Sequence, residues 1–235
     1  NYAGYFIGSI GYFIEKLCSN ITNYHILISS KTKQEFIKIF KPKNKQIIVF
    51  PCAISYDEIK LVLKSKSIKK NLFLSINRLI PEKRIDLAIK KIKNINAKLL
   101  IIGIGPEKNN LKKLINKLKL NKKVQFIDRL ERKQLINTIK SSKGLLMLSK
   151  REGLSLITLE SIALKTLVII SDKTSLPEEV KKLCMKTNEN KIQEVLKVII
   201  KSNKNIKYII NENSKIVLEK FSDKNTLKVY KYLIK

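Results

Sequence analysis

The chain is organised around the stretch Ser149-Lys150-Arg151-Glu152-Gly153-Leu154-Ser155-Leu156-Ile157-Thr158-Leu159-Glu160. Before it, residues 144–148 form a short apolar run, which is typical of a buried strand. After it, apolar residues recur at helical spacing over 156–164. The sequence therefore predicts a strand, a short turn that holds Glu152 and Gly153, and a helix.

Glu152 and Glu160 are the two acidic residues of this stretch, and two interpretations of them are open. Their separation corresponds to about 12 Å along an ideal helix, so they do not share one proton. They can instead hold two parts of one extended ligand, with an anion between them at the amino end of the helix. Alternatively, Glu152 caps the helix and Glu160 is solvated. Taken alone, the pair favours this structural interpretation.

Further motifs stand before and after the pair, and they change this balance. They are Asn77-Arg78-Leu79-Ile80-Pro81-Glu82-Lys83, Leu99-Leu100-Ile101-Ile102-Gly103-Ile104-Gly105-Pro106, Val124-Gln125-Phe126-Ile127 and Leu176-Pro177-Glu178. In this order and at these spacings, they resemble the nucleotide-sugar-binding half of family-four retaining glycosyltransferases, which have the GT-B fold. The resemblance covers most of the chain and is closest over 72–180.

Strands and helices are predicted to alternate regularly around the central stretch. The predicted strands are 71–76, 98–102, 124–127, 144–148 and 167–170, and the predicted helices between them are 86–93, 108–118, 132–141 and 156–164. Such alternation indicates the α/β class, with a doubly wound, parallel, Rossmann-like sheet that binds ligands at the carboxyl ends of its strands. Each motif quoted above falls at such an end.

The resemblance also implies a domain organisation. Residues 1–59 are expected to be the C-terminal part of an acceptor-side domain, and the Lys- and Ser-rich residues 60–70 a linker. Residues 71–203 are expected to be the donor-binding domain, followed by C-terminal helices over 204–235 that pack back on the first domain. Because the rest of a GT-B N-terminal domain is absent from this sequence, we expect a fragment, a truncated reading frame or a split enzyme.

The resemblance assigns roles to individual residues. It implies that Arg78 and Lys83 bind the diphosphate as the sugar leaves and that Glu152 contacts the donor sugar, so these three are the expected catalytic residues. The donor-binding residues that it implies are Gly103, Gly105, Leu130, Gly153, Leu154, Ser155 and Glu160, with Glu160 on the ribose and Leu130 near the base. The implied reaction retains the anomeric configuration and requires no metal or other cofactor, because the departing phosphate helps to take the acceptor's proton.

Several positions depart from the family pattern. Arg84 and Lys165 stand where the family commonly has Gly, Asp128 replaces a frequent Gly, and Leu167 replaces a Pro. These departures bear on turn geometry more than on ligand contacts. The family's catalytic His belongs to the missing part of the N-terminal domain; His25, the sole His, lies in the wrong segment and is expected to be structural.

The formal net charge of +30 points first to nucleic acid or an anionic membrane as a partner. Only five of the 49 basic residues are Arg, however, and Lys, Asn and Ile are all encoded by A/T-rich codons. A protein that reads bases needs Arg for bidentate contacts to guanine. We therefore expect no nucleic-acid partner and keep contact with an anionic membrane surface open.

Cysteine usage and hydropathy bear on the compartment. Cys18, Cys52 and Cys184 are far apart and odd in number, which argues against zinc and against a disulfide framework and fits a reducing cytoplasm. The apolar run 4–14 is too short to span a bilayer. The expected location is the cytoplasm, at or away from the membrane surface.

The sequence thus predicts an enzyme that moves a sugar from a UDP- or GDP-linked donor to a cell-envelope glycan or a lipid-linked acceptor. A separate chain carrying the rest of the N-terminal domain is an expected partner. Two alternatives stay open: a non-catalytic nucleotide-sugar-binding remnant or subunit, and a basic nucleic-acid-binding protein.

Overall fold

The computed structural model describes residues 2–22, 24–43, 46–50, 53–201 and 204–227, with side chains from residue 10 onward. The chain forms two compact units, Asn1–Cys52 and Ala53–Lys235.

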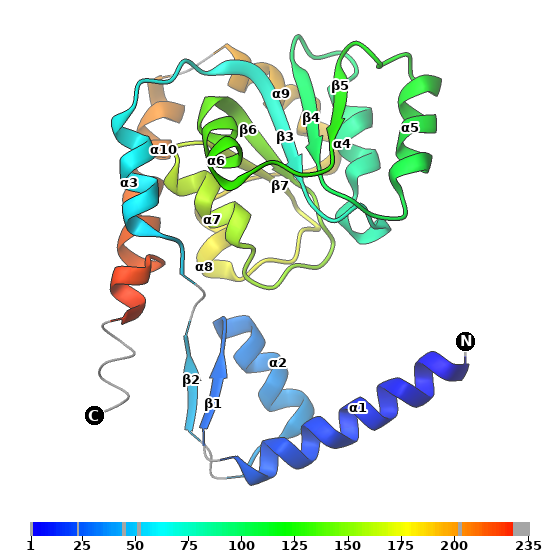
Figure 1. Cartoon of the computed structure of the whole chain (residues 1–235), viewed down its shortest axis with the longest axis vertical. Coiled ribbons are helices and arrows are strands. Elements are labelled where there is room, and N and C mark those ends of the chain that lie inside the picture. Colours follow the sequence, from blue (N-terminus) through cyan, green and yellow to red (C-terminus); the bar gives the residue numbers. More distant parts are fainter. Residues whose placement is uncertain (1, 23, 44–45, 51–52, 202–203, 228–235) are drawn as a thin grey trace. The chain divides into compact units, whose positions relative to one another are not determined.

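The smaller unit contains two helices and a two-stranded parallel sheet (Figure 1). Its elements are α1 (Tyr2–Ile21), β1 (Tyr24–Leu27), α2 (Ser30–Phe40) and β2 (Gln46–Val49). Ser29 begins α2 as its N-cap, because its side chain accepts a hydrogen bond from the Thr32 amide. The His25 ring packs against Phe36 with their centroids 4.7 Å apart, which agrees with a structural role for this residue.

The larger unit is built on a parallel six-stranded sheet in the order β5-β4-β3-β6-β7-β8. The strands are β3 (Lys70–Ile76), β4 (Lys98–Ile102), β5 (Val124–Ile127), β6 (Ser142–Met147), β7 (Leu167–Ser171) and β8 (Met185–Thr187). The chain leaves β3 toward β4 and β5, then returns to place β6 on the other side of β3. The order of the strands reverses there, and in such sheets the crevice outside the carboxyl ends at this point receives ligands.

Helices cover both faces of this sheet (Figure 1). They are α3 (Tyr56–Lys64), α4 (Ile85–Ile92), α5 (Lys108–Lys117), α6 (Arg132–Ser141), α7 (Leu156–Ala163), α8 (Glu178–Lys181), α9 (Ile192–Ile200) and α10 (Lys204–Lys220). Successive strand residues point to opposite faces. Leu74 accordingly packs in a core with residues of α3, α6, α7 and α10, whereas its neighbour Phe73 packs in a second core with α4, α5 and α9. The sheet is therefore doubly wound, as the sequence predicts.

The expected linker differs from the structure. Residues 60–64 belong to helix α3, and the compact units divide at Cys52 and Ala53 instead. The helix forms because the side chain of Ser55 caps it and its first turn is acidic. Ile59, which is fully buried, then anchors it in the larger unit's core. The Lys-rich composition marks the exposed face of this helix, and only 65–69 connect it to β3.

The C-terminal segment packs within the larger unit. Helix α10 contacts α7, and after it Ser222 forms a parallel bridge with Ile54. The amide of Tyr56 donates a 3.0 Å hydrogen bond to Asp223 Oδ1. These contacts join 221–223 to residues that the sequence analysis placed in the first domain but that the structure assigns to the larger unit. The remainder of the expected C-terminal helices, 228–235, lies outside the described residues.

Candidate functional site

The loops that follow β3, β4, β6 and β7 are joined by backbone hydrogen bonds. The bonds run from Leu79 N to Ile104 O (2.9 Å), from Lys150 N to Glu82 O (2.9 Å) and from Glu152 N to Ser175 O (3.1 Å). Four segments that are distant in sequence therefore form one continuous surface at the carboxyl edge of the sheet. This surface includes the point where the strand order reverses.

Two glycines allow the loops after β3 and β4 to meet. A Cβ atom on Gly103 would lie 1.9 Å from the carbonyl oxygen of Asn77, and one on Gly105 would lie 2.4 Å from that of Leu79. No side chain fits at these separations, so both positions require glycine. The close approach observed is to the neighbouring loop, and the expected contact of these glycines with a donor stays a prediction.

Lys83 and Glu152 meet at the point where the strand order reverses. Lys83 ends a short 3-10 helix after β3, and Glu152 lies in the loop between β6 and α7. Lys83 Nζ is 2.6 Å from Glu152 Oε1, and the two side chains are only 19% and 11% exposed. Two of the three expected catalytic residues are thus in direct contact. Glu152 is engaged by this lysine, and Ser155, rather than Glu152, is the N-cap residue of α7.

Glu160 is held by an arginine. Arg132, the first residue of α6, places a guanidinium nitrogen 2.6 Å from Glu160 Oε1. The same guanidinium binds both carboxylate oxygens of Glu58 in α3, with Nε at 3.1 and 3.0 Å. Hydrogen bonds to Glu58 and then to Glu160 raise the pKa of Arg132. Glu160 is 8% exposed, so the interpretation of this residue as a solvated surface carboxylate is wrong.

Arg132 and Glu58 were not among the predicted site residues. The available signal was that Arg132 is one of five arginines in a chain whose other 44 basic residues, from the total of 49, are lysines. A planar guanidinium can bridge two carboxylates with fixed geometry, which an ammonium group cannot do.

The remaining predicted residues lie around this centre. Arg78 is exposed in the loop after β3. Gly153 is exposed and Leu154 is buried in the core, so Leu154 has only its backbone to offer a ligand. Ser155 has a positive φ of 61°, and its hydroxyl lies 2.9 Å from that of Thr158. Leu130 lies farther out, because it follows β5 at the end of the sheet.

Two departures from the family's glycines now have a structural explanation. Arg84 and Lys165 both adopt the left-handed backbone conformation, with φ of 52° and 58°. Glycine adopts this conformation at little cost, whereas other residues are strained there. At Arg84 the side chain forms ion pairs with Glu189 (3.3 Å) and Asp86 (3.8 Å).

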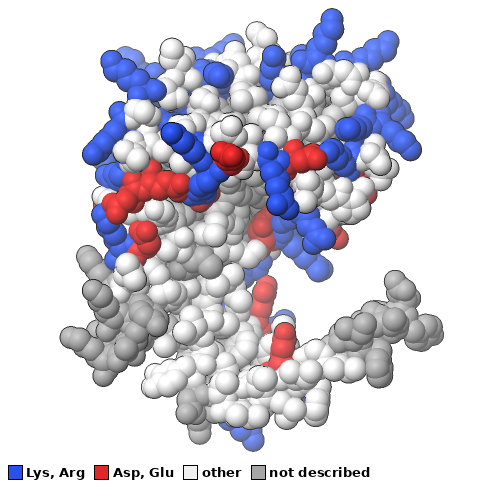
Figure 2. Space-filling view, in the orientation of Figure 1, with Lys and Arg blue, Asp and Glu red and all other residues white. Residues whose placement is uncertain are grey.

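The surface charge is spread out. On the face shown in Figure 2, Lys and Arg side chains are distributed over the larger unit, with acidic side chains between them. This face shows no single basic stripe of the kind that tracks a nucleic-acid backbone. Within the described part of the chain, no three His, Cys, Asp or Glu side chains are grouped so as to hold a metal ion, and no helix is long and apolar enough to cross a membrane.

Comparisons with known proteins agree with this architecture. The family model for glycosyl transferases group 1 matches residues 57–215, from α3 into α10. An uncharacterized glycosyltransferase of Methanocaldococcus jannaschii is 34% identical over 121 residues, which are 49% of this chain and 29% of that protein. A second one from this organism is 26% identical over 230 residues, or 88% of this chain and 59% of that protein. The chain thus spans less than two thirds of either relative.

Solved structures show the same fold. Anabaena HepE, in complex with UDP and glucose, is 13% identical with a TM-score of 0.77, over 94% of this chain and 66% of that one. A glycosyltransferase from Rickettsia africae is 17% identical with a TM-score of 0.74, over 94% of this chain and 67% of that one. These likenesses confirm the predicted fold class, a Rossmann-like α/β sheet of the GT-B type.

Proposed function

Because the chain belongs to the family of glycosyl transferases group 1, we propose that it binds a UDP- or GDP-linked sugar at the carboxyl edge of its larger sheet and transfers the sugar with retention of configuration. In this proposal, residues 71–203 within the larger unit are the donor-binding part, and residues 1–52, the smaller unit, belong to the acceptor side. The acceptor is a cell-envelope glycan or a lipid-linked glycan, and the enzyme works in the cytoplasm or at the membrane surface facing it.

The contact between Lys83 and Glu152 carries the proposal. A cation and a carboxylate from different loops meet in the crevice where sheets of this kind bind ligands. A lysine ammonium has three donors, so Lys83 can keep Glu152 as a partner and also receive a diphosphate oxygen. Arg78, exposed on the same loop, supplies a second cation. Together these cations stabilise the negative charge that develops on the diphosphate as the sugar leaves.

The two carboxylates have separate tasks in this proposal. Glu152 orients the donor sugar, and the departing phosphate takes the acceptor's proton. Glu160 accepts hydrogen bonds from the ribose hydroxyls, and Arg132 keeps that carboxylate oriented. Anabaena HepE with UDP and glucose, together with a pneumococcal O-GlcNAc transferase in complex with UDP and GlcNAc, supports a nucleotide-sugar ligand for this fold.

A second candidate is a donor-binding subunit or remnant that needs a separate chain for catalysis, since the family model matches residues 57–215, which lie within the larger unit alone. Sugar transfer by the purified chain alone would decide against this candidate. Donor binding without transfer would favour it.

Calorimetric titration with UDP, GDP and ADP and their sugar conjugates tests the proposal. We expect saturable binding of one nucleotide. Arg78→Ala and Glu160→Ala should each weaken it by about 10- to 100-fold, because each removes a charge-assisted hydrogen bond. Lys112→Ala, which removes an exposed cation from α5, is the matched control and should bind like the wild type. Equal affinities in all three variants, with the fold intact by circular dichroism, would show that the site lies elsewhere.

A further inference from the structure

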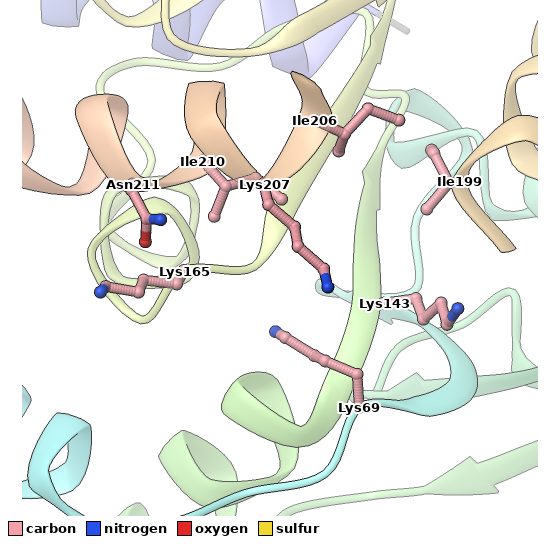
Figure 3. Close-up of a pocket in the computed structure, with 8 residues that line it drawn as sticks. All are labelled: Lys69, Lys143, Lys165, Ile199, Ile206, Lys207, Ile210 and Asn211. Carbon is pink, nitrogen blue, oxygen red and sulfur yellow. The ribbon is translucent and has the colours of Figure 1, made fainter. Parts of the chain in front are cut away.

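A cavity lined by lysines and isoleucines lies at the opposite edge of the same sheet. It has a volume of about 250 Å³ and is lined, among the described residues, by Lys69, Lys143, Lys165, Ile199, Ile206, Lys207, Ile210 and Asn211 (Figure 3). Its lysines come from four elements: the segment before β3, the start of β6, the turn between α7 and β7, and the first turn of α10. The cavity is therefore at the amino ends of the strands, whereas the proposed donor site is at their carboxyl ends.

The charges of this cavity are not balanced. No Asp or Glu belongs to its described lining, and within the described part of the chain no carboxylate forms an ion pair with any of its four lysines. Lys143 Nζ is occupied by the carbonyl oxygen of Ile200, at 2.6 Å. Figure 3 shows the ends of Lys69 and Lys207 directed toward each other across the opening. These two ammonium groups thus face one space without a countercharge.

The surroundings of Lys69 show the effect of this missing countercharge. Lys69 is an exposed residue, but its ammonium donates a 2.8 Å hydrogen bond to the hydroxyl of Thr166, which is 1% exposed. Burial and the neighbouring charge of Lys140 lower the pKa of Lys69 to about 7. The pKa of Lys140 is itself lowered by burial and by Lys165. Lys140 is not in the cavity lining and donates to the carbonyl oxygen of Val62 at 2.6 Å, so it supplies charge behind Lys69 without a carboxylate partner among the described residues. An anion in the cavity would therefore stabilise the charged form of Lys69.

We propose that this cavity binds a phosphate group attached to an apolar moiety. The ammonium groups of Lys69 and Lys207, which are directed toward each other in Figure 3, suit phosphate oxygens, and the amino end of α10 adds partial positive charge beside Lys207. Ile199, Ile206 and Ile210 form an apolar wall that fits the non-polar part of the ligand. Two sources share this chemistry: a soluble phosphate ester and the headgroup of an anionic phospholipid. The cavity is independent of the proposed donor site.

Titration of the full chain with inorganic pyrophosphate at constant ionic strength is the first experiment. Lys207→Gln is the test variant, since Lys207 is exposed on α10 and its loss should leave the fold intact. Lys112→Gln removes the same charge from α5, outside the cavity lining, and is the matched control. We expect Lys207→Gln to weaken binding about tenfold and Lys112→Gln to leave it unchanged. Equal weakening by both variants would mean that only the overall charge attracts anions. That result, pyrophosphate binding unchanged in Lys207→Gln, or no binding at all would each overturn the proposal.

Vesicles distinguish the two sources. If the ligand is a lipid, the chain should co-sediment with phosphatidylcholine vesicles that contain phosphatidic acid but not with pure phosphatidylcholine. Lys207→Gln should reduce this binding about tenfold, and pyrophosphate should compete with it. If the ligand is a soluble ester, pyrophosphate binding should depend on Lys207 while vesicle binding is the same for Lys207→Gln and Lys112→Gln.

Proton uptake provides an independent readout. An anion in the cavity should raise the pKa of Lys69, so the wild-type chain should take up protons when pyrophosphate binds at pH 8. Titrations in two buffers with different ionisation heats measure this uptake. The uptake should fall in Lys69→Met, because among the described lysines only Lys140, whose pKa is also lowered, is then left beside the position to take up protons. Undiminished uptake in that variant would place the bound anion outside this cavity.

Discussion

The two edges of the larger sheet differ in whether their charged side chains are paired. At the carboxyl edge, Lys83 is paired with Glu152, and Arg132 with Glu160 and Glu58. At the amino edge, four lysines line a cavity without one carboxylate among its described residues. The chain has 19 acidic residues for 49 basic ones, so most cations have no partner available. Where pairs do form, they fix the orientation of side chains, whereas unpaired cations leave a positive potential that attracts an anion.

The two edges also differ in the space that is available around a glycine of the backbone. At the carboxyl edge, a Cβ atom on Gly103 would meet the carbonyl oxygen of Asn77 at 1.9 Å. Near the amino edge, a Cβ atom on Gly144 in β6 would first meet the side-chain Cδ1 of Ile169, at 2.7 Å. A backbone carbonyl in a hydrogen-bonded loop cannot move away, but the end of an isoleucine can rotate. The carboxyl edge is therefore the more rigidly constructed of the two.

The largest expected effect is the difference between alanine at these two glycines. Gly103→Ala should lower the free energy of unfolding by about 3 kcal/mol or more, because the loops after β3 and β4 would have to separate. Gly144→Ala should cost about 1 to 2 kcal/mol, because the end of Ile169 must rotate away while the Leu167 carbonyl oxygen and Phe73, each at 3.2 Å, need to shift only slightly. Urea denaturation followed by circular dichroism measures both. Equal losses would contradict the proposed difference in rigidity.

The next effect concerns pH. The pKa of Lys69 is about 7 in the folded chain and has an ordinary value of 10.5 when unfolded. Between these two pKa values, the unfolded chain binds more protons at Lys69 than the folded chain does, so the free energy of unfolding rises with pH. Below pH 7 both states are protonated, and the destabilisation from burying the charged Lys69 has its full size. The pKa of Arg132 is raised, so its ion pairs at the carboxyl edge stay charged throughout this window.

Unfolding free energies measured at pH 7 and pH 10 therefore distinguish the contribution of the amino-edge cavity to stability from that of the carboxyl edge. The wild type should gain on the order of 1 kcal/mol from Lys69 over this interval, allowing for solvent screening, relative to Lys69→Met. Lys112→Met is the control and should show the same rise as the wild type. If Lys69→Met shows the same difference in unfolding free energy between pH 7 and pH 10 as the wild type, the amino-edge cavity is not the source of that difference.

Much of the fold was predictable from local patterns. The central strand and helix around Ser149 to Glu160 were found because apolar residues follow each element's own period over several residues. Helix α3 was missed because its exposed face is rich in Lys, which resembles a linker, while Ile59 is its one buried residue. The strand β8 has only three residues, too few to show a period.

The site was predictable only where motifs follow one another in order. Lys83 and Glu152 were both named from their motifs, but their direct contact depends on tertiary structure. The bond between Arg132 and Glu58 joins residues 74 positions apart, with no motif around Glu58. The lysines of the amino edge were invisible for another reason: four lysines do not stand out in a chain of this composition.

The smallest expected effects come from three left-handed residues, one at the carboxyl edge, one in the lysine cavity and one outside both sites. Arg84, Lys165 and Lys119 have φ of 52°, 58° and 58°. Lys119→Gly isolates the relief of backbone strain, because this exposed residue follows α5 and is not part of the cavity lining. Part of the relief is offset by the greater entropy of glycine in the unfolded chain, which leaves a gain of about 0.5 kcal/mol.

The two edges should depart from this reference in opposite directions. Lys165→Gly also removes a cation from the crowded cavity, so it should stabilise the chain by more than Lys119→Gly, about 1 kcal/mol in total. Arg84→Gly also breaks the 3.3 Å ion pair with Glu189, whose side chain is 17% exposed, so its net effect should be close to zero. Urea midpoints at constant slope measure all three variants. If Arg84→Gly stabilises the chain as much as Lys165→Gly does, the ion pairs of the carboxyl edge do not contribute to stability, and charge pairing there serves only to orient side chains for the ligand.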